Sequence, residues 1–363
     1  MTAKSTPVPA RAVAPGRILR RELDARGWTQ ADLAGIIGRP TQAISELVQG
    51  KKQITPETAL ELAAAFGTSP DLWLNLESAY RLHLARRHHQ AETIQRKSKL
   101  WELVPMRELL KRGWVAEDKD PQRLERAVLD FLGVASPDRI RVPDAVFHRT
   151  RTREPWPGAL LAWERRVRAL AAGQQVAPFD HTHLGQCVDD LLALTRSPSD
   201  AGQVPQVLAT YGIGFVVVPH LERTYLDGAV LDADTAPIIA LTLRYDRIDS
   251  FWFTLLHEVA HIVAGHTGSY LDDTENELDR SDPVERTADR LATEWLIPRA
   301  PLGRFIRENT PKFSYAKVDR FATEIGRHSG IIVGRLQHEG TLPPSHLRSR
   351  LEAVREYLVA EAA

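Results

Sequence analysis

The segment Asp249 to Val263 restricts the fold more than any other part of the sequence, because it combines a helical pattern with unusual apolar density. The segment is dense in large apolar residues, namely Phe251, Trp252, Phe253, Leu255, Leu256, Ile262 and Val263. Such residues are mostly buried in folded proteins, so we expect this helix to lie inside a folded domain. The chain must therefore build a core large enough to enclose it.

Two histidines on this helix predict a metal site. His257 and His261 are four residues apart, which places both imidazoles on one face of a helix, and Glu258 lies beside them. Zinc takes nitrogen and carboxylate ligands, and metal-assisted hydrolysis needs a base near the attacking water. We therefore expect one Zn²⁺ per chain, or another divalent metal, with Glu258 as the general base. The alternative is a buried helix whose histidines only fill the core.

A third metal ligand is expected on a downstream helix that begins at Asp282-Pro283 and ends before Pro298. We choose Glu285 as this ligand, and Asp289, one turn later, to accept a hydrogen bond from a ligating histidine. A capping box after Asp282 would also explain Glu285.

Other candidates for the third ligand remain open. They are His266 and the acidic loop residues Asp272, Asp273, Glu275 and Glu277. A helix holds Glu285 more rigidly than a loop would hold these residues, which favours Glu285. His266 is also a candidate for stabilising the oxyanion.

Two short helices near the N-terminus predict a helix-turn-helix. Thr29 caps a helix from Gln30 to Ile37 with Asp32 in a capping-box position, and a second helix from Thr41 to Gln49 follows a tight turn. The alternative is an ordinary helical bundle with a polar exterior. On the first interpretation the residues that face DNA are Gln30, Thr41, Gln42 and Ser45, with Lys51 and Lys52 near phosphates and Gln42 as the base contact.

Charge favours a front half that faces nucleic acid, although a charged stretch can also be only a solvated face. Residues 1–100 carry 15 Lys and Arg against 9 Asp and Glu, a net charge of +6, although the whole chain is neutral. The single cysteine, Cys187, excludes an intramolecular disulfide and a cysteine-based zinc cluster. Apolar runs stay below the roughly 18 residues of a membrane helix, so we expect a cytoplasmic protein that does not enter the membrane.

The predicted fold is α+β and mostly helical. We expect a flexible N-terminus (1–14), an all-α helix-turn-helix domain (15–80), a helical connecting region (81–210), a zincin-like domain with a small β-sheet (211–342) and a C-terminal helix (343–363). Short apolar runs predict the strands of the sheet at Ile213–Pro219, Gly228–Leu231 and Pro237–Leu243. Residues 100–210 contain no motif that we associate with catalysis.

Two blocks of the sequence resemble the ImmA/IrrE metallopeptidase family. They are the block from Phe251 to His261 and the block from Glu285 to Pro298, and a later piece, Ser329 to Gly340, resembles the helical segment that closes the domain in that family. The resemblance covers roughly 210–340. It implies that His257, His261 and Glu285 are ligands, that Glu258 is the general base, and that the chain is a zinc metalloendopeptidase that cuts a repressor or other regulatory protein.

Residues 15–80 resemble the XRE-type helix-turn-helix of HigA-like antitoxins. The similarity lies in the helix start at Gln30 and in the ending from Ile44-Ser45 to Gly50-Lys51. It implies binding to double-stranded operator DNA, a homodimer, and a toxin as a candidate partner. Two functions follow: a transcriptional regulator that is also a peptidase, or a repressor or antitoxin whose zincin-like domain is a non-cleaving sensor or scaffold. Glu258 favours the first, because a scaffold needs no base.

Overall fold

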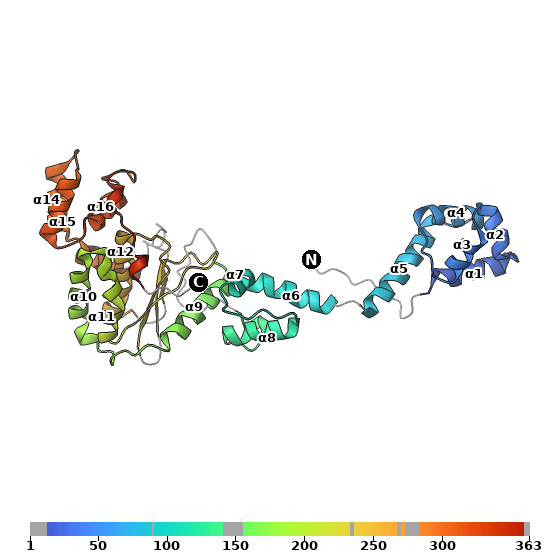
Figure 1. Ribbon diagram of the computed structural model, residues 1–363, viewed down its shortest axis with the longest axis horizontal. Coiled ribbons are helices and arrows are strands. Elements are labelled where there is room, and N and C mark those ends of the chain that lie inside the picture. The colour runs from blue at the N-terminus through green and yellow to red at the C-terminus, as the bar shows by residue number, and fades with distance from the viewer. Residues whose placement is uncertain are drawn as a thin grey trace. The chain divides into compact units, whose positions relative to one another are not determined.

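The chain folds into two compact units that divide between Gln95 and Arg96 (Figure 1). This structure is a computed structural model, and it describes residues 13–88, 91–140, 155–232, 236–266, 270–272 and 283–358. The predicted flexible N-terminus falls almost entirely outside these ranges. The domain boundaries expected from the sequence stay predictions, apart from the differences given below.

The first unit is entirely helical in its described part. Its helices are α1 (Pro15–Arg26), α2 (Gln30–Ile37), α3 (Thr41–Val48), α4 (Pro56–Phe66) and α5 (Pro70–His88). The Thr29 side chain accepts from the backbone of Asp32, whose carboxylate in turn accepts from the backbone of Thr29, so the expected capping box is present. Leu19, Leu33, Ile44, Leu62 and Trp73 form the centre of the core.

The second unit begins with helices from the region expected to connect two domains. They are α6 (Ala91–Leu103), which starts just before the division, α7 (Met106–Lys111), α8 (Pro121–Leu132), η1 (Pro137–Arg139) and α9 (Pro157–Ala171). Apolar residues of these helices share one core with residues of the sheet, among them Trp163 with Val216 and Ala240. Within the described residues this stretch therefore covers a face of the sheet instead of serving as a linker.

The sheet is small, mixed and buried. Its strands are β1 (Gly214–Val217), β2 (Gly228–Leu231), β3 (Ile238–Leu241) and β4 (Tyr270–Asp272), in the order β1-β3-β2-β4. β1 and β3 are parallel, whereas β2 is antiparallel to β3 and to β4. Every residue of β1 to β3 is buried, as expected for a sheet covered on both faces.

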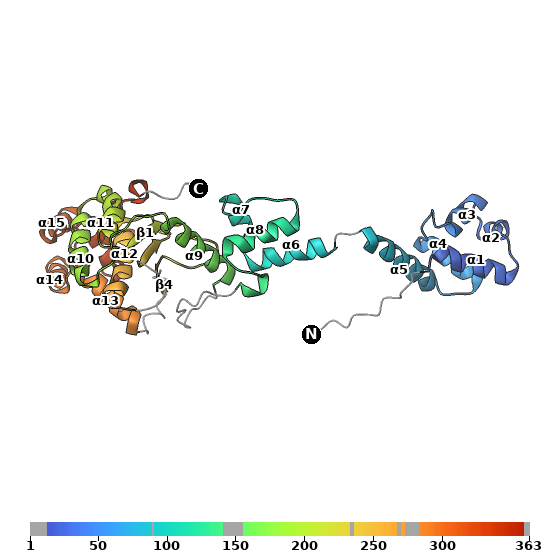
Figure 2. The same ribbon diagram turned by 90° about the horizontal axis from the view of Figure 1, so that it is seen from below.

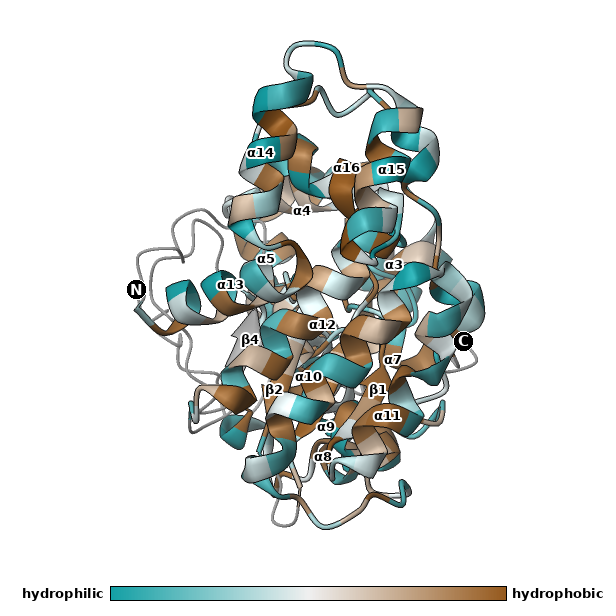
Figure 3. Ribbon diagram, turned by 90° about the vertical axis from the view of Figure 1, so that its left-hand side faces the viewer, coloured by the Kyte–Doolittle hydropathy of each residue, from teal (hydrophilic) through white to brown (hydrophobic). Residues whose placement is uncertain are grey.

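Helices cover the second face of the sheet. The remaining helices are η2 (His181–His183), α10 (Leu184–Ala193), η3 (Leu194–Arg196), η4 (Pro198–Gln203), α11 (Val204–Thr210), α12 (Ile248–Val263), α13 (Pro283–Leu296), α14 (Arg299–Asn309), α15 (Tyr315–Ile325) and α16 (Ser329–His338). Figure 2 shows the sheet between α9 on one side and α10 to α12 on the other. In Figure 3, α14 and α15 alternate between hydrophilic and hydrophobic residues, as helices with one buried face do.

The expected buried helix is α12. It packs against β2, β3, α13 and α16, and its residues from Leu255 to Ile262 are all buried. The predicted fold class, mostly helical α+β with an all-α N-terminal domain and a small sheet in the C-terminal domain, is confirmed.

The C-terminal helix expected over 343–363 is wrong for the described residues, which end at Leu358. The structure has only the short turns η6 (Arg348–Arg350) and η7 (Arg355–Tyr357) there. Asp246 Oδ1 accepts hydrogen bonds from the backbone N–H groups of Val354 and Arg355, each at 2.9 Å, and Glu352 O accepts from Ile248 N. These bonds to another part of the chain replace the i→i−4 bonds of a helix.

None of the helices in the described parts of the chain combines the length and the apolar character that a membrane crossing requires.

Candidate functional site

Two helices bring three predicted ligands together. His257 and His261 lie one turn apart on α12, and Glu285 lies in the first turn of α13, which packs along α12. The Nε2 atoms of the two histidines are 3.1 Å apart. Glu285 Oε2 lies 3.2 Å from His257 Nε2 and 3.6 Å from His261 Nε2. All three side chains are buried, and we call them the His-His-Glu cluster.

The donor set of this cluster fits zinc. Zinc bonds to imidazole nitrogen and carboxylate oxygen are about 2.0–2.2 Å long, so tetrahedral angles put two ligand atoms about 3.3–3.6 Å apart. The three observed separations, 3.1, 3.2 and 3.6 Å, lie close to this range. Three protein ligands leave one position open, which is typical of catalytic zinc sites. The cluster can therefore hold a divalent metal, and the assignment of zinc belongs to the proposal below.

The environment of Glu285 favours its ionised form. Burial alone raises the pKa of the carboxyl group, but the hydrogen bonds and charge of His257 and His261 outweigh burial, so the pKa of Glu285 lies well below its usual range. An ionised carboxylate is the form that ligates metal. The sequence left two explanations for Glu285, a metal ligand or a helix cap. The structure places it in the His-His-Glu cluster.

Asp289 lies where the sequence predicts. Its Oδ1 atom is 3.0 Å from His257 Nδ1, the ring nitrogen that faces away from Glu285. A carboxylate in this position holds the proton on Nδ1 and leaves Nε2 with a lone pair for a metal.

His266 contacts the His-His-Glu cluster through the ring of His261. Its Nδ1 atom lies 3.0 Å from His261 Nδ1, so it contacts the nitrogen of His261 that is not directed at His257 and Glu285. This contact suits a residue that orients His261. The oxyanion role suggested by the sequence stays a prediction. Of the acidic alternatives, Asp273, Glu275 and Glu277 lie outside the described residues, and Asp272 ends β4.

Glu258 is enclosed between α12 and the sheet. It is fully buried, and its carboxylate lies against Gly228 at the start of β2. A Cβ atom on residue 228 would overlap Glu258 Oε1 and would lie 2.8 Å from Thr254 Cγ2. Glycine at position 228 therefore makes room for the carboxylate. Sequence reasoning missed Gly228, because only the packing of β2 under α12 reveals its role.

The predicted DNA-contacting residues lie on and just after the two central helices of the first unit. Thr41, Gln42, Lys51 and Lys52 are exposed, whereas Gln30 and Ser45 are half-buried. Gln42 Nε2 donates to Glu46 Oε1 at 3.1 Å, and Ser45 Oγ accepts from Gln49 Nε2 at 2.9 Å. The exposed residues are available to a ligand such as DNA, and the individual contacts stay predictions.

Each of the two units contains a region that matches the model of a known protein family. Residues 19–73 match the helix-turn-helix family model, and residues 216–324 match the model of the IrrE N-terminal-like domain, a family classed with the M78 peptidases. The second match contains His257, His261 and Glu285.

Relatives of the first unit include regulators and antitoxins. The uncharacterized HTH-type transcriptional regulator YddM of Escherichia coli K12 is 32% identical over 82 residues, which are 23% of this chain and 87% of that protein. Antitoxin HigA-1 of Vibrio cholerae is 36% identical over 83 residues, 23% of this chain and 78% of that protein. The solved structure of a HigA-family addiction module antidote protein from Coxiella burnetii is 38% identical over 22% of this chain and 86% of its own, with a TM-score of 0.21.

Proposed function

Because the chain belongs to the XRE-type helix-turn-helix family and also has an IrrE N-terminal-like domain, we propose that it is a DNA-binding transcriptional regulator that hydrolyses a peptide bond in a regulatory protein. The observation that carries the proposal is the His-His-Glu cluster, buried and convergent, next to the buried carboxylate of Glu258. Binding to operator DNA would place the protein in the cytoplasm.

The residues in and around the cluster support separate roles in hydrolysis. His257, His261 and Glu285 would hold a zinc ion, which would act there as a Lewis acid toward water and a carbonyl oxygen. Glu258 takes the proton of the attacking water and delivers it to the leaving amine. Asp289 and His266 hold the ring orientations of His257 and His261 through their Nδ1 atoms.

The first unit supplies the DNA contacts in this proposal. Gln42 reads a base edge, and Lys51 and Lys52 contact phosphates. Two copies of the chain bind the two halves of an operator, as helix-turn-helix proteins commonly do. The substrate is a protein such as a repressor.

A second candidate function is an antitoxin or repressor whose C-terminal domain binds metal or a partner without cleaving anything. Its support is the similarity of the first unit to Antitoxin HigA-1, which also makes a toxin a candidate partner. Glu258 favours the peptidase, because a carboxylate with no solvent exposure is expensive to bury and a scaffold has no use for it.

Metal content tests the site directly. The wild type, His261→Ala, Glu285→Ala and Glu258→Gln proteins are purified and loaded with zinc, and their metal is measured by mass spectrometry. We expect about one zinc per chain in the wild type and in Glu258→Gln, and a loss in both ligand variants. A wild type that holds no metal after loading would reject the zinc site.

Cleavage is tested with a peptide mixture from the digested cytoplasmic proteome. New N-termini are identified after incubation with zinc-loaded wild type or with zinc-loaded Glu258→Gln. Termini produced only by the wild type support the peptidase. Identical termini in both samples, with metal present in both, reject it and leave the non-cleaving regulator.

A further inference from the structure

Two charged residues of α5 reach back to the loop that follows α3. Glu77 and Arg81 lie one turn apart on α5 and form an ion pair, with Arg81 Nε 2.7 Å from Glu77 Oε1. The loop between α3 and α4 covers residues 49–55 and carries Lys51 and Lys52, the lysines that we expect to contact phosphates. We call the ion pair the α5 brace.

The α5 brace holds this loop at two points. Glu77 Oε2 accepts a hydrogen bond from the backbone N–H of Ile54 at 3.3 Å, and Arg81 Nη2 donates to Gly50 O at 3.4 Å. Both distances exceed the usual range of about 2.7–3.2 Å, so we attribute the hold to the two bonds acting together. In the sequence these two attachment points enclose the pair of lysines.

The burial of Glu77 shows that its two partners are needed. Only 8% of its surface is exposed. A buried carboxylate is costly unless it is paired and hydrogen-bonded, and here the guanidinium of Arg81 and the N–H of Ile54 satisfy it. A purely structural role in the core of the first unit is the alternative, and it makes a different prediction for DNA binding.

The helix α3 has supports of its own. The backbone N–H groups of Lys51 and Lys52 donate to Glu46 O at 2.9 and 3.2 Å. A Cβ atom on Gly16 of α1 would overlap Val48 O, so α1 and the end of α3 are in direct contact. Loss of the α5 brace should therefore loosen the loop more than it moves α3.

We propose that Glu77 and Arg81 are positioning residues that hold Lys51 and Lys52 against the phosphates of bound DNA. This inference rests on the proposed DNA binding of the first unit. Both residues of the α5 brace lie beyond residues 19–73, the range that matches the helix-turn-helix model. An ordered loop lowers the entropic cost of fixing the two lysines when DNA binds.

The sign of one effect separates this role from simple electrostatics. Glu77→Gln removes a negative charge, which by itself should strengthen binding to a polyanion. The amide has only one acceptor oxygen, however, so Ile54 N or Arg81 loses a partner. We expect DNA binding by the full chain to weaken by about tenfold at low salt, and the slope of log K against log salt to shrink by about 1–2.

The measurement is a fluorescence anisotropy titration at several salt concentrations, with a duplex from upstream of the gene and with a scrambled duplex of the same length. The ratio of the two affinities should stay at the wild-type value, because α3 carries the base contact. Asp24→Asn removes one negative charge from an exposed position on α1 and is the matched control. It should bind DNA at least as strongly as the wild type.

A second variant keeps the net charge unchanged. Glu77→Gln combined with Arg81→Gln leaves neither charge buried without its partner, and it should lose DNA affinity as Glu77→Gln does. Thermal melting verifies that each variant is folded.

A double-mutant cycle tests whether the α5 brace acts through the lysines. Glu77→Gln is also introduced into a chain that carries Lys51→Ala and Lys52→Ala. In that background it should have no further effect on DNA affinity, because the groups that it positions are gone.

The outcomes distinguish this inference from the DNA-binding function on which it rests. A wild type that binds neither duplex at low salt rejects DNA binding, and the positioning role with it. If the wild type binds and both Glu77 variants bind at least as strongly, only the positioning role is rejected. An equal loss of affinity with and without the two lysines also rejects it, and assigns the α5 brace to the fold alone.

Discussion

Asp289 Oδ1 lies 3.0 Å from His257 Nδ1, while the opposite nitrogen of the same ring lies 3.2 Å from Glu285 Oε2. The ring of His257 thus lies between two carboxylates. Asp289 orients the ring through Nδ1, and Glu285 lies beside Nε2, the nitrogen that would bind a metal. The two acids lie one turn apart on α13, so a single helix provides both.

We expect Asp289→Asn to weaken zinc binding by roughly 10–100-fold, because the amide holds the proton on His257 Nδ1 less firmly. The measurement is competition for zinc with a chromogenic chelator. Glu294→Gln, on the same helix but away from the cluster, is the matched control and should bind zinc as the wild type does. Equal zinc affinity in Asp289→Asn and the control would deny Asp289 this role.

We expect Gly228→Ala to displace the Glu258 carboxylate while leaving the metal ligands in place. Zinc content should stay at the wild-type level, whereas peptide hydrolysis should fall by roughly 10²-fold, the size of effect that small misplacements of a catalytic group produce. Overpacking should also destabilise the fold by about 1–3 kcal/mol.

The control for this substitution is Gly185→Ala, on α10, where an added Cβ meets nothing within 4 Å. It should be neutral or slightly stabilising, because alanine favours the helix. If Gly228→Ala melts and cleaves like Gly185→Ala, the packing of β2 under Glu258 is irrelevant to catalysis.

We expect Gln42→Ala to reduce binding to the operator by about 1–3 kcal/mol and to relax its sequence preference, provided that Gln42 reads a base. Gln42 must first release Glu46, to which it donates in the structure. Lys51→Ala should weaken binding to all sequences alike and reduce the slope of log K against log salt by about 1.

The measurement for both variants is a fluorescence anisotropy titration at several salt concentrations with DNA from upstream of the gene. Lys119→Ala, an exposed lysine of the second unit, serves as control. If Gln42→Ala and Lys51→Ala both bind DNA with wild-type affinity and salt dependence, the DNA contacts lie elsewhere on the chain.

The buried thiol of Cys187 makes the free energy of unfolding depend on pH in the alkaline range. Burial raises the pKa of its thiol to about 12, from an ordinary value near 9. As pH rises above 9, the unfolded chain loses this proton while the folded chain keeps it, so the free energy of unfolding falls until pH approaches 12. Urea unfolding at pH 8 and pH 10.5 should therefore show a larger loss for the wild type than for Cys187→Ala. The same loss in both proteins would contradict this account.

Local patterns predicted much of the fold and of the metal cluster. The Thr29 cap, the three apolar runs that became β1 to β3, and the apolar face of α12 are signals carried within a few neighbouring residues. The spacing of His257 and His261 is likewise local. Glu285 required a choice among acidic residues, because only the packing of α13 along α12 brings it to the histidines.

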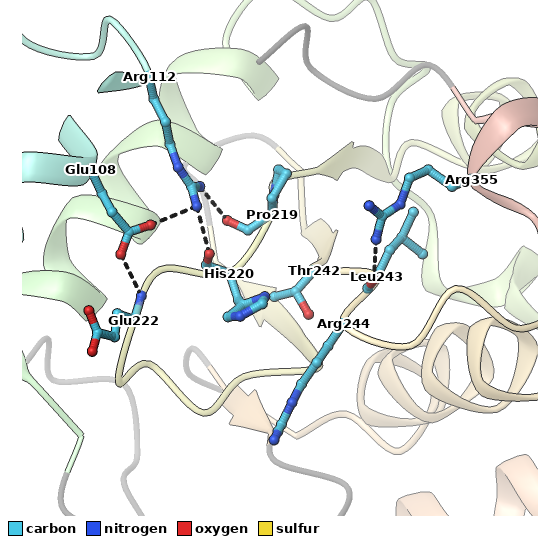
Figure 4. Close-up of a pocket in the computed structure, with 9 residues that line it drawn as sticks. All are labelled: Glu108, Arg112, Pro219, His220, Glu222, Thr242, Leu243, Arg244 and Arg355. Atoms are coloured by element: carbon cyan, nitrogen blue, oxygen red, sulfur yellow. Dashed lines mark hydrogen bonds and ion pairs between the residues drawn. The ribbon is translucent and has the colours of Figure 1, made fainter. Parts of the chain in front are cut away.

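Other features depend on contacts between distant residues. A pocket beyond the ends of β1 and β3 (Figure 4) joins residues from Glu108 to Arg355, and no periodicity in the sequence connects them. The C-terminal helix was wrong because Asp246, more than 100 positions earlier, accepts the backbone N–H groups that a helix would use. His266 reached His261 through a turn after α12 whose course the sequence does not specify.

The bond from Ile248 N to Glu352 O has a consequence for the order of folding. It fastens the first residue of the helix that carries His257 and His261 to a residue more than 100 positions later. The two residues meet only when a long loop closes, and contacts between distant residues form more slowly than the turns of a helix. We therefore expect α12 to gain this attachment late, after its own turns have formed.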